Sequence, residues 1–211
     1  MKFPSGQYGL IYADPPWQFK VHSLCEASRC PDAPVTRNQQ RNNSPERHYK
    51  TMPLRDIMAL RDDILFASAP DCMLLVWAVD PMIPEAIQLG QHWGFTYKTV
   101  GFYWAKERRN NGINNKRPHV KTRPFPMGTG YWTRANPEQC LLFTRGNPKR
   151  LSASVEKLIV APRREHSRKP DEVYDRIEKL IAGPYLELFA RTRRPGWTCW
   201  GNQTEKFKDG A

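Results

Sequence analysis

Apolar and polar residues alternate along this chain in a pattern that predicts short strands interrupted by helices. Apolar runs typical of strands occupy residues 10–13, 72–79, 96–106, 139–144, 156–160, 185–190 and 197–200. Apolar residues at helical spacing predict helices at 51–65, 84–93 and 171–181, and Gly94 and Gly183 end the last two. Because strands alternate with helices, we expect an α/β fold with a mostly parallel sheet and helices on both of its faces.

The first predicted strand leads directly into a turn that contains two prolines. Residues 10–13 are Leu-Ile-Tyr-Ala, and Asp14-Pro15-Pro16-Trp17 follows at once. Because proline has a fixed φ and no backbone N–H, the strand cannot continue its ladder beyond Asp14. The sequence therefore predicts a carboxylate, proline carbonyls and an indole at the carboxyl end of a strand, where ligands bind in open α/β sheets.

This combination of groups suits the methylation of an amino group on a nucleobase. The lone pair of such an amine is delocalised into the ring, so the amine is a poor nucleophile. If Asp14 and the carbonyl of Pro15 each accept one of its N–H bonds, the lone pair leaves conjugation and points at an electrophilic methyl. Trp17 can then stack on the base, which has to be single-stranded or flipped out of a duplex. The alternative is an ordinary strand-ending turn with a buried tryptophan.

Two long segments without clean periodicity, at 20–50 and 106–135, interrupt the predicted elements. Loops of this length in a compact domain are usually functional or disordered. The second segment holds eight basic residues between Lys106 and Arg134, against one acid. Basic groups neutralise phosphates and aromatic rings stack on bases, so we predict nucleic-acid contacts, with a solvated loop as the alternative. The candidate nucleic-acid-binding residues are Lys116, Arg117, Lys121, Arg123, Tyr131 and Trp132.

The charge and the cysteine content indicate what kind of partner the protein binds and in which cellular compartment it works. The 211 residues carry a formal net charge of +12, which favours an acidic partner, most simply nucleic acid. The five cysteines are an odd number and include Cys72 and Cys140 within apolar runs, which predicts a reduced, intracellular protein. No leader and no apolar run of the ~20 residues needed to span a bilayer occurs, so we expect a cytoplasmic location. His22, Cys25 and Cys30 lack a CxxC pair, and we expect no metal.

A second group of polar residues lies near the ends of the last predicted strands. Lys169 precedes the third helix, Glu187 and Arg191 belong to the next strand and its end, and Asn202 and Gln203 follow the last strand. S-adenosylmethionine presents a carboxylate, a ribose diol and an adenine. Lys169 can pair with the carboxylate, and the two amides can hold the diol with Arg191 or Glu187 beside them. Each residue alone has an ordinary structural explanation, but together with Asp-Pro-Pro-Trp they favour a cofactor site.

These ordered motifs resemble the MT-A seventy family (MT-A70). Its members are adenine N6-methyltransferases related to the catalytic subunit of the messenger-RNA N6-adenosine methyltransferase. The chain looks most similar to the compact bacterial and phage members. The matching segments are Tyr-Ala-Asp-Pro-Pro-Trp at 12–17, then 164–172, 186–191 and 195–203, with a weaker match at 130–138.

The resemblance implies a Rossmann-like methyltransferase fold in a permuted order, with the catalytic strand first and the cofactor strands last. The loops at 20–50 and 106–135 correspond to the two variable loops beside the family's active site. The implied catalytic residues are Asp14, Pro15, Pro16 and Trp17. The implied cofactor-binding residues are Asp14, Lys169, Glu187, Phe189, Arg191, Asn202 and Gln203.

The prediction from these observations is an S-adenosylmethionine-dependent DNA adenine N6-methyltransferase formed by a single domain, residues 1–211. Catalysis is expected to rest on positioning and hydrogen-bond acceptance, without a metal. An RNA adenine methyltransferase and a non-catalytic nucleic-acid-binding scaffold are the alternatives. Larger relatives hold the cofactor adenine with an acid upstream of the catalytic strand. Thirteen residues precede Asp14 here, so we expect that contact to be absent or supplied elsewhere.

Overall fold

The computed structural model describes residues 2–19, 51–108, 125–126, 128, 132–165 and 168–207. Its strands are β1 (Tyr8–Ala13), β2 (Ser68–Ala78), β3 (Thr96–Glu107), β4 (Glu138–Arg145), β5 (Leu158–Pro162), β6 (Tyr185–Leu188) and β7 (Trp197–Trp200). Its helices are α1 (Leu54–Met58), α2 (Arg61–Ala67), the short 3-10 helix η4 (Asp80–Met82), α3 (Ile83–His92) and α4 (Glu172–Leu180). Each predicted strand therefore has a counterpart in the structure.

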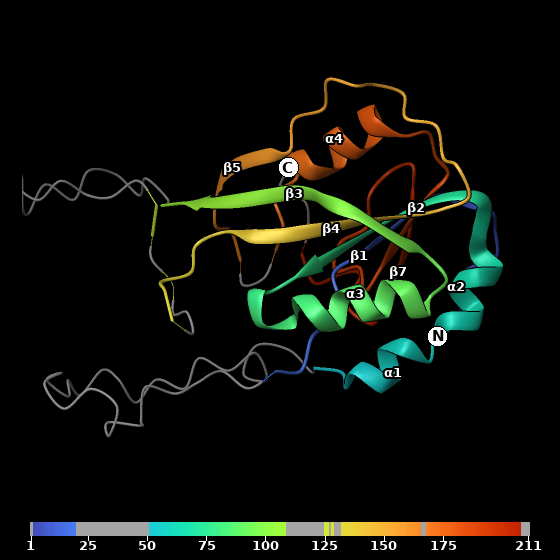
Figure 1. Cartoon of the computed structure of the whole chain (residues 1–211), viewed down its shortest axis with the longest axis horizontal. Helices are drawn as coiled ribbons and strands as arrows, with labels where there is room; N and C mark the ends of the chain where they lie inside the picture. The colour runs from blue at the N-terminus through green and yellow to red at the C-terminus, as the bar shows by residue number, and fades with distance from the viewer. Residues whose placement is uncertain are drawn as a thin grey trace, which may run out of the picture.

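The strands form one sheet in the order β5-β3-β4-β2-β1-β6-β7. All neighbouring pairs are parallel except the two that involve β4, which runs antiparallel to both β2 and β3. The mostly parallel α/β sheet is confirmed, and the reversal of β4 is a feature that the apolar pattern did not indicate. With β1 between β2 and β6, the first strand lies beside the last two strands, and β7 forms the edge of the sheet (Figure 1).

Helices cover both faces of the sheet, as predicted. In Figure 1, α1 and α3 lie below the sheet and α4 lies above it. On the lower face, Ile57, Ile64 and Leu89 pack with strand residues into one core cluster. On the upper face, Val173 and Ile177 of α4 pack into a second cluster. Both clusters bury apolar side chains completely, so the central strands are buried on both faces, which is typical of parallel sheets.

Two predicted helix boundaries differ from those observed. The helix expected at 51–65 is two short helices, because Leu60 has φ −73° and ψ 0° and α2 begins anew after it. Helix α4 ends when Ile181 adopts an extended conformation with φ −146°, so Gly183 is not its cap. Gly94 does follow α3, with a φ of +88° that favours glycine.

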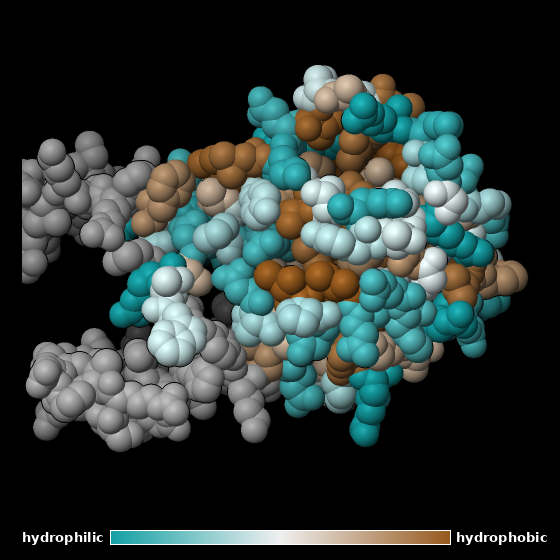
Figure 2. Space-filling model, viewed as in Figure 1, coloured by the Kyte–Doolittle hydropathy of each residue, from teal (hydrophilic) through white to brown (hydrophobic). Residues whose placement is uncertain are grey.

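The surface in the view of Figure 2 is mainly hydrophilic, and its apolar side chains occur in small separate groups. None of the helices in the described part of the chain is both long enough and apolar enough to cross a membrane.

Asn136 links the end of β3 to the segment that leads into β4. Its side chain accepts the N–H of Lys106 at 3.0 Å and donates to the carbonyls of Lys106 and Pro126.

Candidate active site

Backbone hydrogen bonds accepted by the carbonyls of the two prolines hold the turn after β1. The N–H of Trp17 donates to the carbonyl of Pro15, and the N–H of Met52 donates to the carbonyl of Pro16, both at 2.8 Å. The indole N–H of Trp17 donates to the carbonyl of Trp77 on β2 at 2.9 Å. The turn is thus tied to the strand beside it, which fixes the carboxyl end of β1.

Burial defines what Trp17 does in this structure. Its ring is 4% exposed and belongs to the core cluster below the turn. The ring therefore supports the turn from beneath, and its stacking on a nucleobase stays a prediction.

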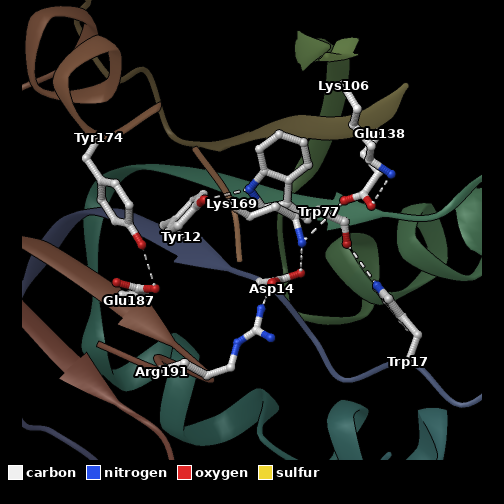
Figure 3. Close-up of polar contacts among 10 residues, drawn as sticks. All are labelled: Tyr12, Asp14, Trp17, Trp77, Lys106, Glu138, Lys169, Tyr174, Glu187 and Arg191. Carbon is white, nitrogen blue, oxygen red and sulfur yellow. Dashed lines mark hydrogen bonds and ion pairs between the residues drawn. The ribbon is translucent and has the colours of Figure 1, made fainter. Parts of the chain in front are cut away.

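Five charged side chains of alternating sign follow one another across the carboxyl edge of the sheet (Figure 3). Lys106 Nζ lies 2.7 Å from Glu138 Oε1, and Lys169 Nζ lies 3.4 Å from Glu138 Oε2. Lys169 Nζ also lies 2.7 Å from Asp14 Oδ1, and Arg191 Nη2 lies 2.5 Å from Asp14 Oδ2. All five side chains are between 7% and 20% exposed. Since each largely buried charge is compensated by the next, the chain of ion pairs fixes the orientation of the Asp14 carboxylate.

Glu138 and Lys169 hold each other in their charged forms. Burial raises the pKa of Glu138, but Lys169 and Lys106 outweigh burial and lower this pKa to about 2. Burial lowers the pKa of Lys169, but Asp14 and Glu138 raise it, and the net shift is upward. Near neutral pH, the Lys169–Glu138 pair is therefore ionised on both sides.

Trp77 on β2 contacts both Tyr12 and Lys169 (Figure 3). Its indole N–H donates to the hydroxyl of Tyr12 at 2.6 Å. The ammonium of Lys169 lies 5.3 Å from the centre of the Trp77 ring, within the range of a cation–π contact. Burial raises the pKa of Tyr12 well above its ordinary value, so its hydroxyl stays neutral and can accept this bond.

Glu187 on β6 is a buried carboxyl with one close partner. It is 7% exposed, and the hydroxyl of Tyr174 on α4 donates to its Oε1 at 2.9 Å. Burial raises the pKa of Glu187 to about 7, although the hydrogen bond from Tyr174 acts in the opposite direction. This carboxyl therefore changes charge close to neutral pH.

Two cavities meet at Asp14, one toward α1 and one toward α4. The larger has a volume of about 400 Å³ and is lined by Asp14, Pro15, Pro16, residues 51–53, Asp56, Phe189, Arg191 and residues 200–203. The smaller, of about 40 Å³, has Lys169, Tyr174 and Glu187 among its walls. Asp14, Phe189 and Arg191 line both cavities, so the Asp14–Arg191 ion pair is part of the wall between them.

A sequence model of one family, MT-A70, matches residues 8–203. This range contains all seven strands and every residue that lines the larger cavity. The chain belongs to the MT-A70 family. The predicted resemblance is confirmed, and with it the Rossmann-like α/β class of the fold.

Three relatives show how far the similarity extends. The chain is 32% identical over 206 residues to the Type II methyltransferase M.MunI of Mycoplasma sp, which covers 95% of this chain and 79% of that protein. It is 29% identical over 206 residues to the N(6)-adenosine-methyltransferase MT-A70-like of Arabidopsis thaliana, covering 94% and 24%. It is 27% identical over 208 residues to the N(6)-adenosine-methyltransferase catalytic subunit METTL3 of Homo sapiens, covering 95% and 29%. The chain therefore spans most of the first relative and less than a third of the other two.

The residues implied by the MT-A70 family for cofactor binding fall on the two sides of Asp14. Asn202 and Gln203 line the larger cavity, whereas Lys169 and Glu187 line the smaller one. Lys169 was expected to pair with the cofactor carboxylate, and here it pairs with Asp14 and Glu138. Its contact with the cofactor stays a prediction, as do the other assigned contacts.

The larger cavity of this MT-A70 protein suits S-adenosylmethionine by its own chemistry. The amides of Asn202 and Gln203 offer donors and acceptors to a diol, and Phe189 and Trp200 supply apolar walls. The backbone of Phe189 has a φ of 59°, in the left-handed region that non-glycine residues rarely adopt and that often marks functional sites. A volume of about 400 Å³ is in the range of small-molecule sites.

Most of the predicted nucleic-acid-binding residues lie outside the described residues, namely Lys116, Arg117, Lys121, Arg123 and Tyr131. Trp132 is described and is fully exposed. His22, Cys25 and Cys30 also lie outside the described residues. In the ranges that the structure describes, no cluster of His, Cys, Asp and Glu side chains could hold a metal ion.

Sequence reasoning missed three members of the site, Trp77, Glu138 and Tyr174. Glu138 closes the weakly matching segment 130–138, and an acid directly before an apolar strand was the available signal. Lys106 was counted both as the end of the predicted strand 96–106 and as the start of the basic segment; it belongs to β3 and pairs with Glu138. Its ion pair has a physical reason, because Glu138 begins the neighbouring strand β4 and its carboxylate lies beside the Lys106 ammonium.

Proposed function

We propose that this protein is an S-adenosylmethionine-dependent DNA methyltransferase that acts on the N6 amine of adenine. One observation carries the proposal: a single cavity is lined by Asp14, Pro15 and Pro16 on one side and by Asn202 and Gln203 on the other. The acceptors suited to an amine and the amides suited to a ribose thus share one space. Membership of the MT-A70 family and similarity to a Type II methyltransferase support the same chemistry.

Asp14 and Pro15 are the groups that bind the amine in this proposal. Each Asp14 oxygen already accepts one hydrogen bond from a cation, and each keeps a lone pair for a further donor. The carbonyl of Pro15 accepts the N–H of Trp17 and likewise keeps one lone pair. Two N–H bonds held by these acceptors turn the amine lone pair out of conjugation. Asp14 acts as a hydrogen-bond acceptor, and the proton leaves after the methyl has been transferred.

Lys169 and Arg191 are positioning residues for Asp14. They engage its two oxygens from opposite sides, at 2.7 and 2.5 Å, so the carboxylate is fixed before a substrate arrives. Such preorganisation lowers the barrier because no reorientation is needed during the reaction. S-adenosylmethionine, when bound, supplies an electrophilic sulfonium methyl. Asn202, Gln203, Phe189 and Trp200 are the residues we assign to its binding.

The choice of DNA rests on two supports. The Type II methyltransferase M.MunI is matched over 79% of its length, whereas the proteins named for N(6)-adenosine are matched over less than a third of theirs. The net charge of +12 suits a polyanion. The second support for DNA is shared with RNA, and the names of the adenosine-specific relatives make an RNA adenine methyltransferase the second candidate.

The test compares the wild-type chain with Asp14→Asn and Asp14→Ala. Methyl transfer from radiolabelled S-adenosylmethionine is measured on matched single-stranded and double-stranded DNA and RNA oligonucleotides that contain adenine. We expect adenine methylation of DNA by the wild type and none by either variant. Asparagine keeps the shape of the side chain and one acceptor oxygen but, like alanine, leaves Lys169 and Arg191 without a counter-charge, so Asp14→Asn separates loss of the charge from loss of the side chain. Calorimetry with S-adenosylhomocysteine should show a smaller loss of affinity than of activity.

Near-normal methylation by Asp14→Asn would disprove the catalytic assignment. Methylation confined to RNA would select the second candidate. No detectable binding of S-adenosylmethionine by a folded wild-type chain would favour the non-catalytic scaffold. Sequencing of modified adenines in DNA from cells that express the chain would give the target motif.

The basic segment offers an independent test of nucleic-acid binding. Replacing Lys116, Arg117, Lys121 and Arg123 together with glutamine should weaken DNA binding and reduce the slope of log affinity against log salt, by about 0.9 per lost phosphate contact. The control is Lys157→Gln with Lys179→Gln, since neither residue lines either cavity. An unchanged salt slope would mean that the segment does not contact the nucleic acid.

A further inference from the structure

Trp200, the last residue of β7, carries a buried hydrogen-bond donor that none of the described residues satisfies. Its side chain lines the larger cavity, yet its indole nitrogen is closed to solvent and has no hydrogen-bond partner within the described part of the chain. Buried donors without a partner are uncommon in folded proteins and call for an explanation. Glu85 Oε2 is the other such atom, and it does not line either cavity.

The strand register gives the position of Trp200 relative to the catalytic turn. Ala13 of β1 is paired with Leu188 of β6, and Leu188 is paired with Trp200 of β7. All three strands are parallel, so their carboxyl ends meet at one edge of the sheet. Adjacent strands are spaced by about 4.8 Å, so Trp200 lies about 10 Å along this edge from the residue before Asp14. A long ligand with its reactive end at Asp14 therefore extends its other end to Trp200.

The surroundings of Trp200 are those of a site for a flat ring. Phe189 meets it edge to face with centroids 5.9 Å apart, and Phe3 packs against it at 5.0 Å. Asn202 and Gln203 follow it directly and line the same cavity. If these amides bind the ribose, the base attached to that ribose lies beside the indole of Trp200.

We propose that Trp200 binds the purine of the cofactor, with the indole as a wall and its N–H donating to a ring nitrogen. This inference rests on the proposed function, because it needs S-adenosylmethionine in the larger cavity. In the ligand-free protein the nitrogen is turned away from solvent. A turn of the half-buried side chain brings it to the cavity surface, where a purine acceptor relieves the cost of the unpaired donor. Trp200 thereby helps to select a purine nucleoside as the cofactor's far end.

The experiment measures binding of S-adenosylhomocysteine and its 1-deaza, 3-deaza and 7-deaza analogues by calorimetry. Each analogue replaces one acceptor nitrogen of the purine by C–H. The proteins are the full-length wild type, Trp200→Phe, Trp200→Leu and the control Phe66→Leu, whose side chain is 72% exposed and lines neither cavity. Phenylalanine keeps an aromatic wall and removes the N–H, whereas leucine removes both.

We expect one deaza analogue to bind the wild type about three- to tenfold more weakly than the parent, the range of a single hydrogen bond. Trp200→Phe should lose a similar factor for the parent and bind that analogue as the wild type does. Trp200→Leu should lose more, and Phe66→Leu should match the wild type. Because Trp200→Phe removes an unsatisfied donor, the melting temperature without ligand should not fall, so a weaker affinity cannot be attributed to misfolding.

Three results would overturn the inference while leaving the proposed function intact. The first is that wild type and Trp200→Phe bind each of the four ligands with the same affinity. The second is a loss in Trp200→Phe that every deaza analogue shares, because the donor would then serve another part of the cofactor. The third is a wild type that does not distinguish the deaza analogues from the parent. No binding of S-adenosylhomocysteine by the wild type would instead remove the cofactor and the proposed function with it.

Discussion

Glu187 offers the sharpest test of the electrostatics of this fold. It is a buried carboxyl on β6 whose pKa is raised by burial from its ordinary value of 4.5 to about 7. Between these two pH values the folded protein holds a proton that the unfolded chain has already released. By linkage, stability must then fall as pH rises through this window. The stabilising contribution is complete below pH 4.5 and is lost once pH exceeds about 7.

The size of the effect follows from the pKa difference. A rise of the pKa from 4.5 to about 7 changes the free energy of unfolding by on the order of 3 kcal/mol between low and high pH. Glu187→Gln keeps the shape of the side chain and an acceptor for the hydroxyl of Tyr174, but it cannot ionise. We therefore expect wild type and Glu187→Gln to have similar stability at pH 5, and the variant to be more stable by on the order of 3 kcal/mol at pH 8.

The assay is urea denaturation followed by circular dichroism at pH 5, 6, 7 and 8. Only the difference between wild type and variant is interpreted, since other groups titrate in both proteins. Glu156→Gln is the control, because its side chain is 84% exposed and should follow the wild type at every pH. Parallel stability curves for wild type and Glu187→Gln across this range would refute the reasoning.

Three further predictions concern the parts of the fold that support the site. Glu138→Gln should lower the free energy of unfolding by about 3 kcal/mol at pH 7, because it leaves the buried Lys169 less compensated. Since the pKa of wild-type Glu138 is lowered to about 2, the stability difference between wild type and variant in urea denaturation should shrink as pH falls from 4.5 to 2. Gly201→Ala should lower the melting temperature, because a Cβ there would lie 2.6 Å from the carbonyl oxygen of Ala190, whereas an unchanged melting temperature would show that the turn can move. Arg176→Met should increase light scattering on heating, because the guanidinium caps two carbonyls beside the edge strand β5; equal scattering would refute this protective role.

The fold could be predicted because its elements are set by local patterns. The run from Cys72 to Val79 reads as a strand buried on both faces, and β2 is such a strand. The stripe of Val173, Tyr174 and Ile177 reads as a helix with one buried face, and α4 packs this way. Apolar periodicity reports which face of an element is buried, so it predicts elements and layers well.

Pairing direction and tertiary ion pairs could not be predicted in this way. The strand β4 lies between β2 and β3, and nothing in its apolar run distinguishes an antiparallel from a parallel neighbour. The ion pairs of Asp14 join residues 155 and 177 positions away in the chain. No periodicity links such distant charges, so Lys169 was assigned to the cofactor and Glu138 to no role.

The site depends on the register of the last strands with β1 more than on any single side chain. Tyr12 is paired with Glu187, and Ala13 with Leu188, so Arg191 emerges from β6 at a point from which it reaches Asp14. Side chains on a strand alternate between the two faces of the sheet, and a slip of one residue would turn each to the opposite face. Glu187 would then leave Tyr174 and α4, and Arg191 would lose its pair with Asp14. The register is held because Leu186 and Leu188 are fully buried in the core on the α1 side, so a slip would place Glu187 in that apolar core. The packing that stabilises the sheet therefore also aligns the Asp14 carboxylate with the Arg191 cation that pairs with it.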